Sequence, residues 1–171
     1  GAPYQNTRHN AGQFVLRDLL RLVGDVQLST LKKAEASVAK TPTAIFAESL
    51  LFMNESGKSI RSVIEYFDKD FQAGDSLDAV YVIHDDLDLE LGQYKIQFGT
   101  GPKIHNGLLS TYQYLKTMNF WHVRVGVDTR NGDRSLPAAN YVLQHFSETE
   151  LQKMRTTSVV IAQELKNRTA I

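Results

Sequence analysis

The chain has 171 residues, of which 42% are hydrophobic and 22% charged, and its formal net charge is zero. This size and balance predict one globular domain over residues 1–171. The chain has no cysteine, which excludes disulfides, cysteine nucleophiles and cysteine-based zinc sites. No apolar run approaches the roughly 20 residues of a membrane span, so we expect no membrane association. Neutrality argues against non-specific coating of nucleic acid, although a local basic patch is compatible with it.

Hydrophobic spacing predicts helices that alternate with strands along the chain. Apolar residues at helical spacing predict helices over 12–23, 60–67, 106–115 and 137–144. Short apolar or alternating runs predict strands over 43–47, 78–84, 91–98 and 121–127. A long helix is expected from Ser147, because Ser147 and Glu150 have the spacing of a capping box. Strands interleaved with helices predict an α/β sandwich.

One segment is ambiguous. The stretch from Leu28 to Lys40 has no clear period, and its charged residues suggest a solvated segment. The secondary structure of this segment is therefore left open.

Four short clusters carry His, Asn or Asp at the boundaries of predicted elements, over residues 4–12, 52–57, 84–88 and 105–107, and all but 84–88 include a Gly. In open α/β sheets, ligands gather at strand ends, where such clusters fall. An imidazole can take a proton from water, and a carboxylate can orient it. Side-chain amides can bind a carbonyl whose oxygen gains charge. The combination suits hydrolysis of an activated acyl bond such as an ester.

Other interpretations remain open on the residues alone. His9 precedes a predicted helix and could be a cap or a surface residue. The run from His84 to Asp88 could be an acidic turn or a Mg²⁺ site. Gly57-Lys58-Ser59 has the ending of a phosphate-binding loop, but Phe52 stands where that motif needs its first Gly, so we discard it.

The clusters, taken in order, resemble the bacterial-type peptidyl-tRNA hydrolases. The family pattern Tyr-x-x-Thr-Arg-His-Asn-x-Gly is followed by Met-Asn-x-Ser-Gly, His-Asp-(Asp/Glu)-Leu-Asp and His-Asn-Gly-Leu, then by an Arg-(Ile/Val)-Gly strand and a Tyr-Val-Leu…Phe-Ser…Glu stretch. The matching segments here are Tyr4 to Gly12, Met53 to Gly57, His84 to Asp88, His105 to Leu108, Arg124 to Gly126, and Tyr141 to Glu150. Six motifs in order over nearly the whole chain are highly specific. The resemblance implies a single-domain three-layer sandwich, with a twisted mixed central sheet flanked by helices.

The resemblance also implies an activity and its residues. It implies hydrolysis of the ester bond between peptide and tRNA, with His9 as general base on water and Asp85 orienting His9. No cofactor, metal or covalent intermediate is expected. The substrate-binding residues that it implies are Tyr4, Asn10, Met53, Asn54, His105, Asn106, Lys95, Lys103 and Arg124. Among these, Asn54 and Asn106 would hold the ester, the peptide backbone or the terminal adenosine, and Met53 and His105 would line the cleft.

The implied partner is peptidyl-tRNA, bound through its acceptor end and its 5′ phosphate. Arg124, with Lys95 nearby, would belong to a clamp on that phosphate, although Arg124 could also be a solvated strand charge. The resemblance favours a monomer in the cytoplasm, and a mitochondrial address is equally compatible with the sequence.

The chain departs from the family pattern at three places. The family's opening strand and the Asn of its Gly-Asn-Pro-Gly loop have no counterpart ahead of Gly1, so we expect a truncated chain. Lys103 and Ile104 replace glycines of the loop before His105, and Gln97 stands where the family has a clamp lysine. Lys95 lies two residues from Gln97, on the same strand face, and could substitute.

These departures motivate an alternative function, a non-catalytic RNA-binding relative with the same fold. His9 and Asp85 are both present, which favours the enzyme. A hydrolase of small esters is a third possibility, but the sequence offers no acyl specificity pocket for it.

Overall fold

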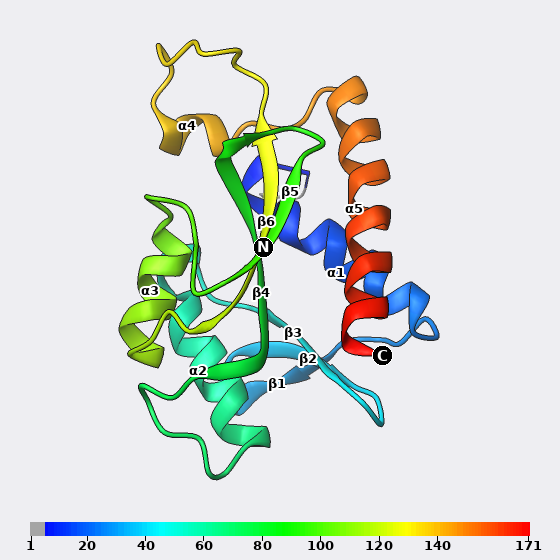
Figure 1. Cartoon of the computed structure of the whole chain (residues 1–171), viewed down its shortest axis with the longest axis vertical. Coiled ribbons are helices and arrows are strands. Elements are labelled where there is room, and N and C mark those ends of the chain that lie inside the picture. The colour runs from blue at the N-terminus through cyan, green and yellow to red at the C-terminus, as the bar shows by residue number, and fades with distance from the viewer. Residues whose placement is uncertain (1–5) are drawn as a thin grey trace.

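The structure is a computed structural model that describes residues 6–171. Within this range the chain forms two three-stranded sheets and five α-helices (Figure 1). The first sheet has the order β1-β2-β3 and is antiparallel, with strands Ser29–Leu31, Ala36–Lys40 and Ile45–Ser49. The second has the order β4-β6-β5, with strands Leu77–Glu90, Phe120–Asp128 and Tyr94–Phe98. In it β6 runs parallel to β4 and antiparallel to β5, so the sheet is mixed.

The helices cover both faces of the second sheet. Their bounds are α1 Ala11–Leu22, α2 Ser56–Phe67, α3 Asn106–Leu115, α4 Ala138–Val142 and α5 Glu148–Thr169. In Figure 1, α3 lies on one side of β4 and β6, and α1 and α5 lie on the other. Three short 3-10 turns, η2 Arg8–Asn10, η3 Lys32–Ala34 and η4 Met53–Glu55, precede α1, β2 and α2. The predicted α/β sandwich is therefore confirmed.

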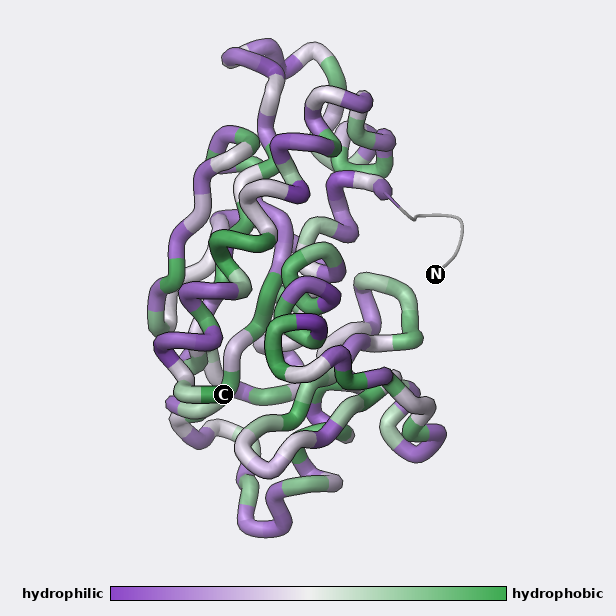
Figure 2. Tube along the Cα trace, turned by 90° about the vertical axis from the view of Figure 1, so that its right-hand side faces the viewer, coloured by the Kyte–Doolittle hydropathy of each residue, from purple (hydrophilic) through white to green (hydrophobic). Residues whose placement is uncertain are grey.

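The alternation of side chains along β6 explains the layering, because successive residues point to opposite faces of a sheet. Val123, Val125 and Val127 are fully buried and belong to the main core, which α1 and α5 complete. His122 and Arg124 point to the opposite face, toward α3 and β5. The apolar face makes the core, and the polar face lies near the proposed site. Figure 2 shows hydrophobic (green) and hydrophilic (purple) residues interspersed along the chain.

Residues 28–40, which the sequence left ambiguous, form regular secondary structure. This segment forms β1, η3 and β2 instead of a solvated loop. Lys32 and Lys33 are exposed at the turn, as their charge requires, whereas Ala36 and Val38 pack against Val63 of α2 in a small separate core. The pattern of β2 was hard to recognise in the sequence because its apolar residues are small and stand close to charged ones.

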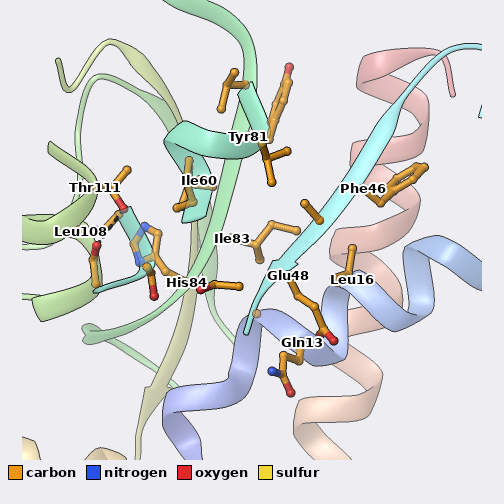
Figure 3. Close-up of a pocket in the computed structure, with 18 of the residues that line it drawn as sticks. Gln13, Leu16, Phe46, Glu48, Ile60, Tyr81, Ile83, His84, Leu108 and Thr111 are labelled. Carbon is orange, nitrogen blue, oxygen red and sulfur yellow. Dashed lines mark hydrogen bonds between the residues drawn. The ribbon is translucent and has the colours of Figure 1, made fainter. Parts of the chain in front are cut away.

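The expected single central sheet is found as two sheets. In the described part of the chain, β3 pairs with β2, β4 pairs with β6, and no strand lies between β3 and β4. A cavity of about 1900 Å³ occupies the space, lined by Ile45 to Ser49 of β3 and by residues 77–85 of β4. Figure 3 shows Phe46 and Glu48 on one side of it and Tyr81 and Ile83 on the other. His9, Asp85 and His105 also line this cavity.

Candidate active site

His9 and Asp85 form a hydrogen-bonded pair although 76 residues separate them. The Nδ1 atom of His9 lies 2.7 Å from Oδ1 of Asp85. Asp85 is 2% exposed in the carboxyl-terminal half of β4, and His9 lies on η2, with its side chain 17% exposed to the cleft. An ionised carboxylate only accepts hydrogen bonds, so Nδ1 of His9 carries the proton and Nε2 is left with a lone pair.

Gly12 allows this approach. A Cβ atom at residue 12 would lie 2.6 Å from the carbonyl oxygen of Ile83 on β4. Only glycine therefore lets the first turn of α1 rest directly on the strand. Because η2 leads straight into α1, this contact fixes His9 beside Asp85. The Gly of the first sequence cluster thus has a structural reason for its position.

His105 is the second imidazole on the same carboxylate. Its Nε2 atom lies 3.0 Å from Oδ1 of Asp85. His105 is also the N-cap of α3, and its Nδ1 atom accepts a hydrogen bond of 3.2 Å from the backbone N–H of Leu108. With Nδ1 accepting, the ring proton lies on Nε2 and is donated to Asp85. The link between His105 and Asp85 was not predicted.

Burial and hydrogen bonding compete at Asp85. Burial alone would raise the pKa of its carboxyl group, but the hydrogen bonds from His105 and His9 outweigh burial and hold the pKa well below its usual range. Asp85 is therefore ionised at neutral pH. Burial lowers the pKa of the neighbouring His84 to about 3, so this ring is neutral, and its Nδ1 lies 3.0 Å from the carbonyl oxygen of Asp85.

The remaining polar residues of the clusters line the same cavity as the imidazole pair. They are Asn10, Met53, Asn54 and Asn106. Asn54 and Asn106 are exposed, whereas Asn10 and Met53 are half-buried. A Cβ at Gly107 would lie 2.6 Å from Sδ of Met53, so the glycine after Asn106 lets η4 approach the start of α3. The structure thus brings together residues of three clusters that are spread between positions 10 and 106.

The basic residues of the expected phosphate clamp do not line this cavity. Arg124 is 8% exposed, and it donates from Nε to Asp86 at 2.6 Å and from a terminal nitrogen to Gln97 at 2.8 Å. Lys95 is exposed and lies opposite Arg124 in the strand register. Lys103 is exposed on the loop before His105. Arg124 is therefore neither a solvated strand charge nor an unpaired cation, because Asp86 neutralises it.

Some expected residues fall outside this description, and some buried polar residues were not anticipated. Tyr4 lies outside the described residues. His122 and Tyr112 lie behind His84, with ring centroids of His84 and His122 5.7 Å apart. Nothing in the sequence marked these two as part of a polar cluster, because they come from separate elements with no motif.

One group of acidic and imidazole side chains in residues 6–171 is compact enough to hold a metal ion. It consists of His9, Asp85 and His105, whose potential ligand atoms lie within 4.8 Å of one another. The backbone N–H of Leu108 holds the proton of His105 on Nε2, the atom that a metal would need. We therefore treat the group as a hydrogen-bonded network and assign no metal to it.

The chain is similar to known proteins over almost its full length. The family model described as peptidyl-tRNA hydrolase matches residues 1–170. A peptidyl-tRNA hydrolase of Corynebacterium efficiens is 37% identical over 150 residues, which cover 88% of this chain and 80% of that protein. One of Mycobacterium tuberculosis is 36% identical over 160 residues, which cover 91% and 79%.

A solved structure agrees on the fold. The crystal structure of peptidyl-tRNA hydrolase from Acinetobacter baumannii superposes with a TM-score of 0.76 at 21% identity and covers 99% of this chain and 87% of that one.

Proposed function

Because the chain belongs to the peptidyl-tRNA hydrolase family, we propose that it hydrolyses the ester bond between peptide and tRNA in peptidyl-tRNA. The observation that supports this most directly is the His9–Asp85 pair at the mouth of a cavity lined by side-chain amides. A buried carboxylate, an oriented imidazole and amide donors suit a reaction in which water attacks an acyl ester.

His9 acts as the general base. Its Nδ1–H is held by Asp85, so Nε2 can take a proton from the attacking water. The water oxygen bonds to the ester carbon, and the negative charge passes to the carbonyl oxygen. When this intermediate collapses, the bond from carbon to the ribose oxygen breaks, and the proton on His9 passes to that oxygen. The products are a free peptide carboxylic acid, which loses its remaining proton to solvent, and a tRNA with its terminal hydroxyl restored.

Asn54 and Asn106 bind the substrate around this centre. Both are exposed and line the cavity, Asn54 from η4 and Asn106 from the first residue of α3. Their amide N–H groups donate to the oxyanion, the peptide backbone or the terminal adenosine. Asn10, Met53 and Tyr4 complete the binding surface.

The tRNA extends away from the cavity over basic residues. Lys95 and Lys103 are exposed cations near the sheet β4-β6-β5 and near the loop before α3, and they bind phosphates of the acceptor end and the 5′ terminus. Arg124 is paired with Asp86, so its contribution is to hold the side chain of Gln97 by a hydrogen bond. We place the protein in the cytoplasm as a monomer. No helix among residues 6–171 is long and apolar enough to cross a membrane.

The residue roles are tested with a defined N-acetylaminoacyl-tRNA as substrate. We expect His9→Ala to lower kcat by at least about 100-fold, within the range for loss of a general base, with tRNA binding and the unfolding midpoint little changed. His145→Asn, an exposed imidazole outside the cavity, is the matched control. Near-normal turnover by His9→Ala would contradict the mechanism, and tRNA binding without cleavage by the wild-type chain would favour a non-catalytic RNA-binding protein.

A further inference from the structure

A single oxygen atom accepts hydrogen bonds from both imidazoles of the site. The Oδ1 atom of Asp85 lies 2.7 Å from Nδ1 of His9 and 3.0 Å from Nε2 of His105. The two rings are 5.2 Å apart between centroids and tilted by 45°, so they do not stack face to face. The carboxylate that orients His9 is therefore divided between two donors.

His105 is fixed at both ends and cannot easily leave the carboxylate. Its Nδ1 atom caps α3 by accepting from the N–H of Leu108, and its Nε2–H points to Asp85. The ring of His84 lies edge-on to it at 5.3 Å. His105 is 9% exposed, so it touches little that enters the cavity. A side chain held in this way suits an effect on Asp85 better than direct substrate binding.

We propose that His105 is a positioning residue that limits how strongly Asp85 stabilises protonated His9, and that it thereby sets the pH range of hydrolysis. The inference rests on the proposed function. A carboxylate oxygen that already accepts one N–H has less charge to offer a second donor. His9 then gains less from Asp85 when it takes the proton of water, and it returns that proton to the ribose oxygen more readily.

Other charged or titratable groups surround the trio of His9, Asp85 and His105, and several of them are paired with one another. Asp86 on β4 is paired with Arg124 on β6, and Arg8 on η2 is paired with Glu150 on α5. His84 on β4 packs edge-on against His105, and His122 on β6 packs against His84. Glu48 on β3 and Glu55 on η4 line the same cavity. Among residues 6–171, the hydrogen bonds to the side chain of Asp85 come from His9 and His105.

Two variants separate the contact with Asp85 from the helix cap. In His105→Asn the side chain is still a good N-cap but is too short to donate to Asp85. In His105→Gln the longer amide can reach the carboxylate and donate without titrating. We expect His105→Asn to move the acid limb of the kcat/KM profile upward by about half to one pH unit, because an opposite charge then stabilises protonated His9 more strongly.

The same variant should lower kcat at neutral pH by roughly 3- to 30-fold, the range for neighbours in one network, with KM little changed. His105→Gln should restore most of both effects. His145→Asn, which changes an exposed side chain outside the cavity lining, should change neither.

A double variant tests whether the effect passes through Asp85. In an Asp85→Asn background, His105→Asn should change kcat by no more than about twofold and leave the profile in place. The inference is overturned if His105→Asn leaves the pH profile unchanged, or if it shifts the profile equally in both backgrounds. The proposed function fails separately, if His9→Ala keeps normal turnover.

Discussion

Gly12→Ala should reduce activity far more than stability, because a methyl group there separates His9 from Asp85. A Cβ at residue 12 lies 2.6 Å from the carbonyl oxygen of Ile83, about 0.8 Å short of an ordinary contact of 3.4 Å. The obstacle is backbone, so α1 must move away from β4 by a similar distance. The bond from His9 to Asp85, now 2.7 Å, would then lengthen to about 3.5 Å, the limit of a weak hydrogen bond.

Two opposing terms set the expected stability of this variant. Alanine in a helix is favoured over glycine by about 0.5–1 kcal/mol, whereas overpacking costs about 1–3 kcal/mol. The net loss should therefore be about 0–2.5 kcal/mol in the free energy of unfolding. A displacement of about 1 Å at a reacting group can lower the rate about 100-fold. The variant should thus stay folded with its activity strongly reduced.

The assay compares urea unfolding with cleavage of N-acetylaminoacyl-tRNA under one buffer condition. Arg17→Ala, an exposed change on the same helix, is the control and should affect neither quantity. If Gly12→Ala kept full activity, the close contact between α1 and β4 would not be what positions His9 beside Asp85.

Three further predictions concern the frame around the site. Arg124→Met leaves Asp86 buried without its ion-pair partner and should destabilise the fold by about 3–5 kcal/mol in urea unfolding, whereas adding Asp86→Asn should recover part of that loss; an unchanged midpoint in the single variant would contradict the pairing. Burial alone would raise the pKa of Glu150, but hydrogen bonds led by that from Thr129 lower it to about 2. Its contribution to stability is therefore complete above about pH 4.5 and is lost as pH falls toward 2, so Glu150→Gln should flatten the dependence of Tm on pH in that window and nowhere else. An alternating apolar peptide that pairs with the edges of β3 and β4 facing the cavity should raise Tm by several degrees, since paired strand edges gain about 1 kcal/mol per hydrogen bond and 1 kcal/mol corresponds to about 2–4 °C here; a scrambled peptide rich in proline should not.

Periodicity predicted the elements whose signals are local. The capping box of Ser147 and Glu150 is present in the structure at the start of α5, with both reciprocal hydrogen bonds. The strand predicted over 121–127 is β6, Phe120–Asp128. In both cases the pattern that decides the element lies within a few neighbouring residues. The hairpin of β1 and β2 was missed because its buried alanines and Val38 gain their reason only from packing under α2.

The site was predictable only to the level of its residues. Motif order named His9, Asp85 and His105, and the structure brings them together. The sharing of one oxygen by two imidazoles was not predictable, since it depends on how α1 and α3 meet at the end of β4. The burial of Arg124 against Asp86 was missed for the same reason, because the facing of β4 and β6 is a long-range feature.

Release of tRNA from a defined N-acetylaminoacyl-tRNA tests directly whether His9, held by Asp85, activates water to attack an ester. The wild-type chain and His9→Ala are followed side by side at neutral pH, with tRNA binding measured for both. We expect cleavage by the wild-type chain and a cleavage rate at least about 100-fold lower for His9→Ala, with tRNA binding retained. Equal rates for the two proteins, or binding without cleavage by either, would rule out His9 as the general base of an esterase.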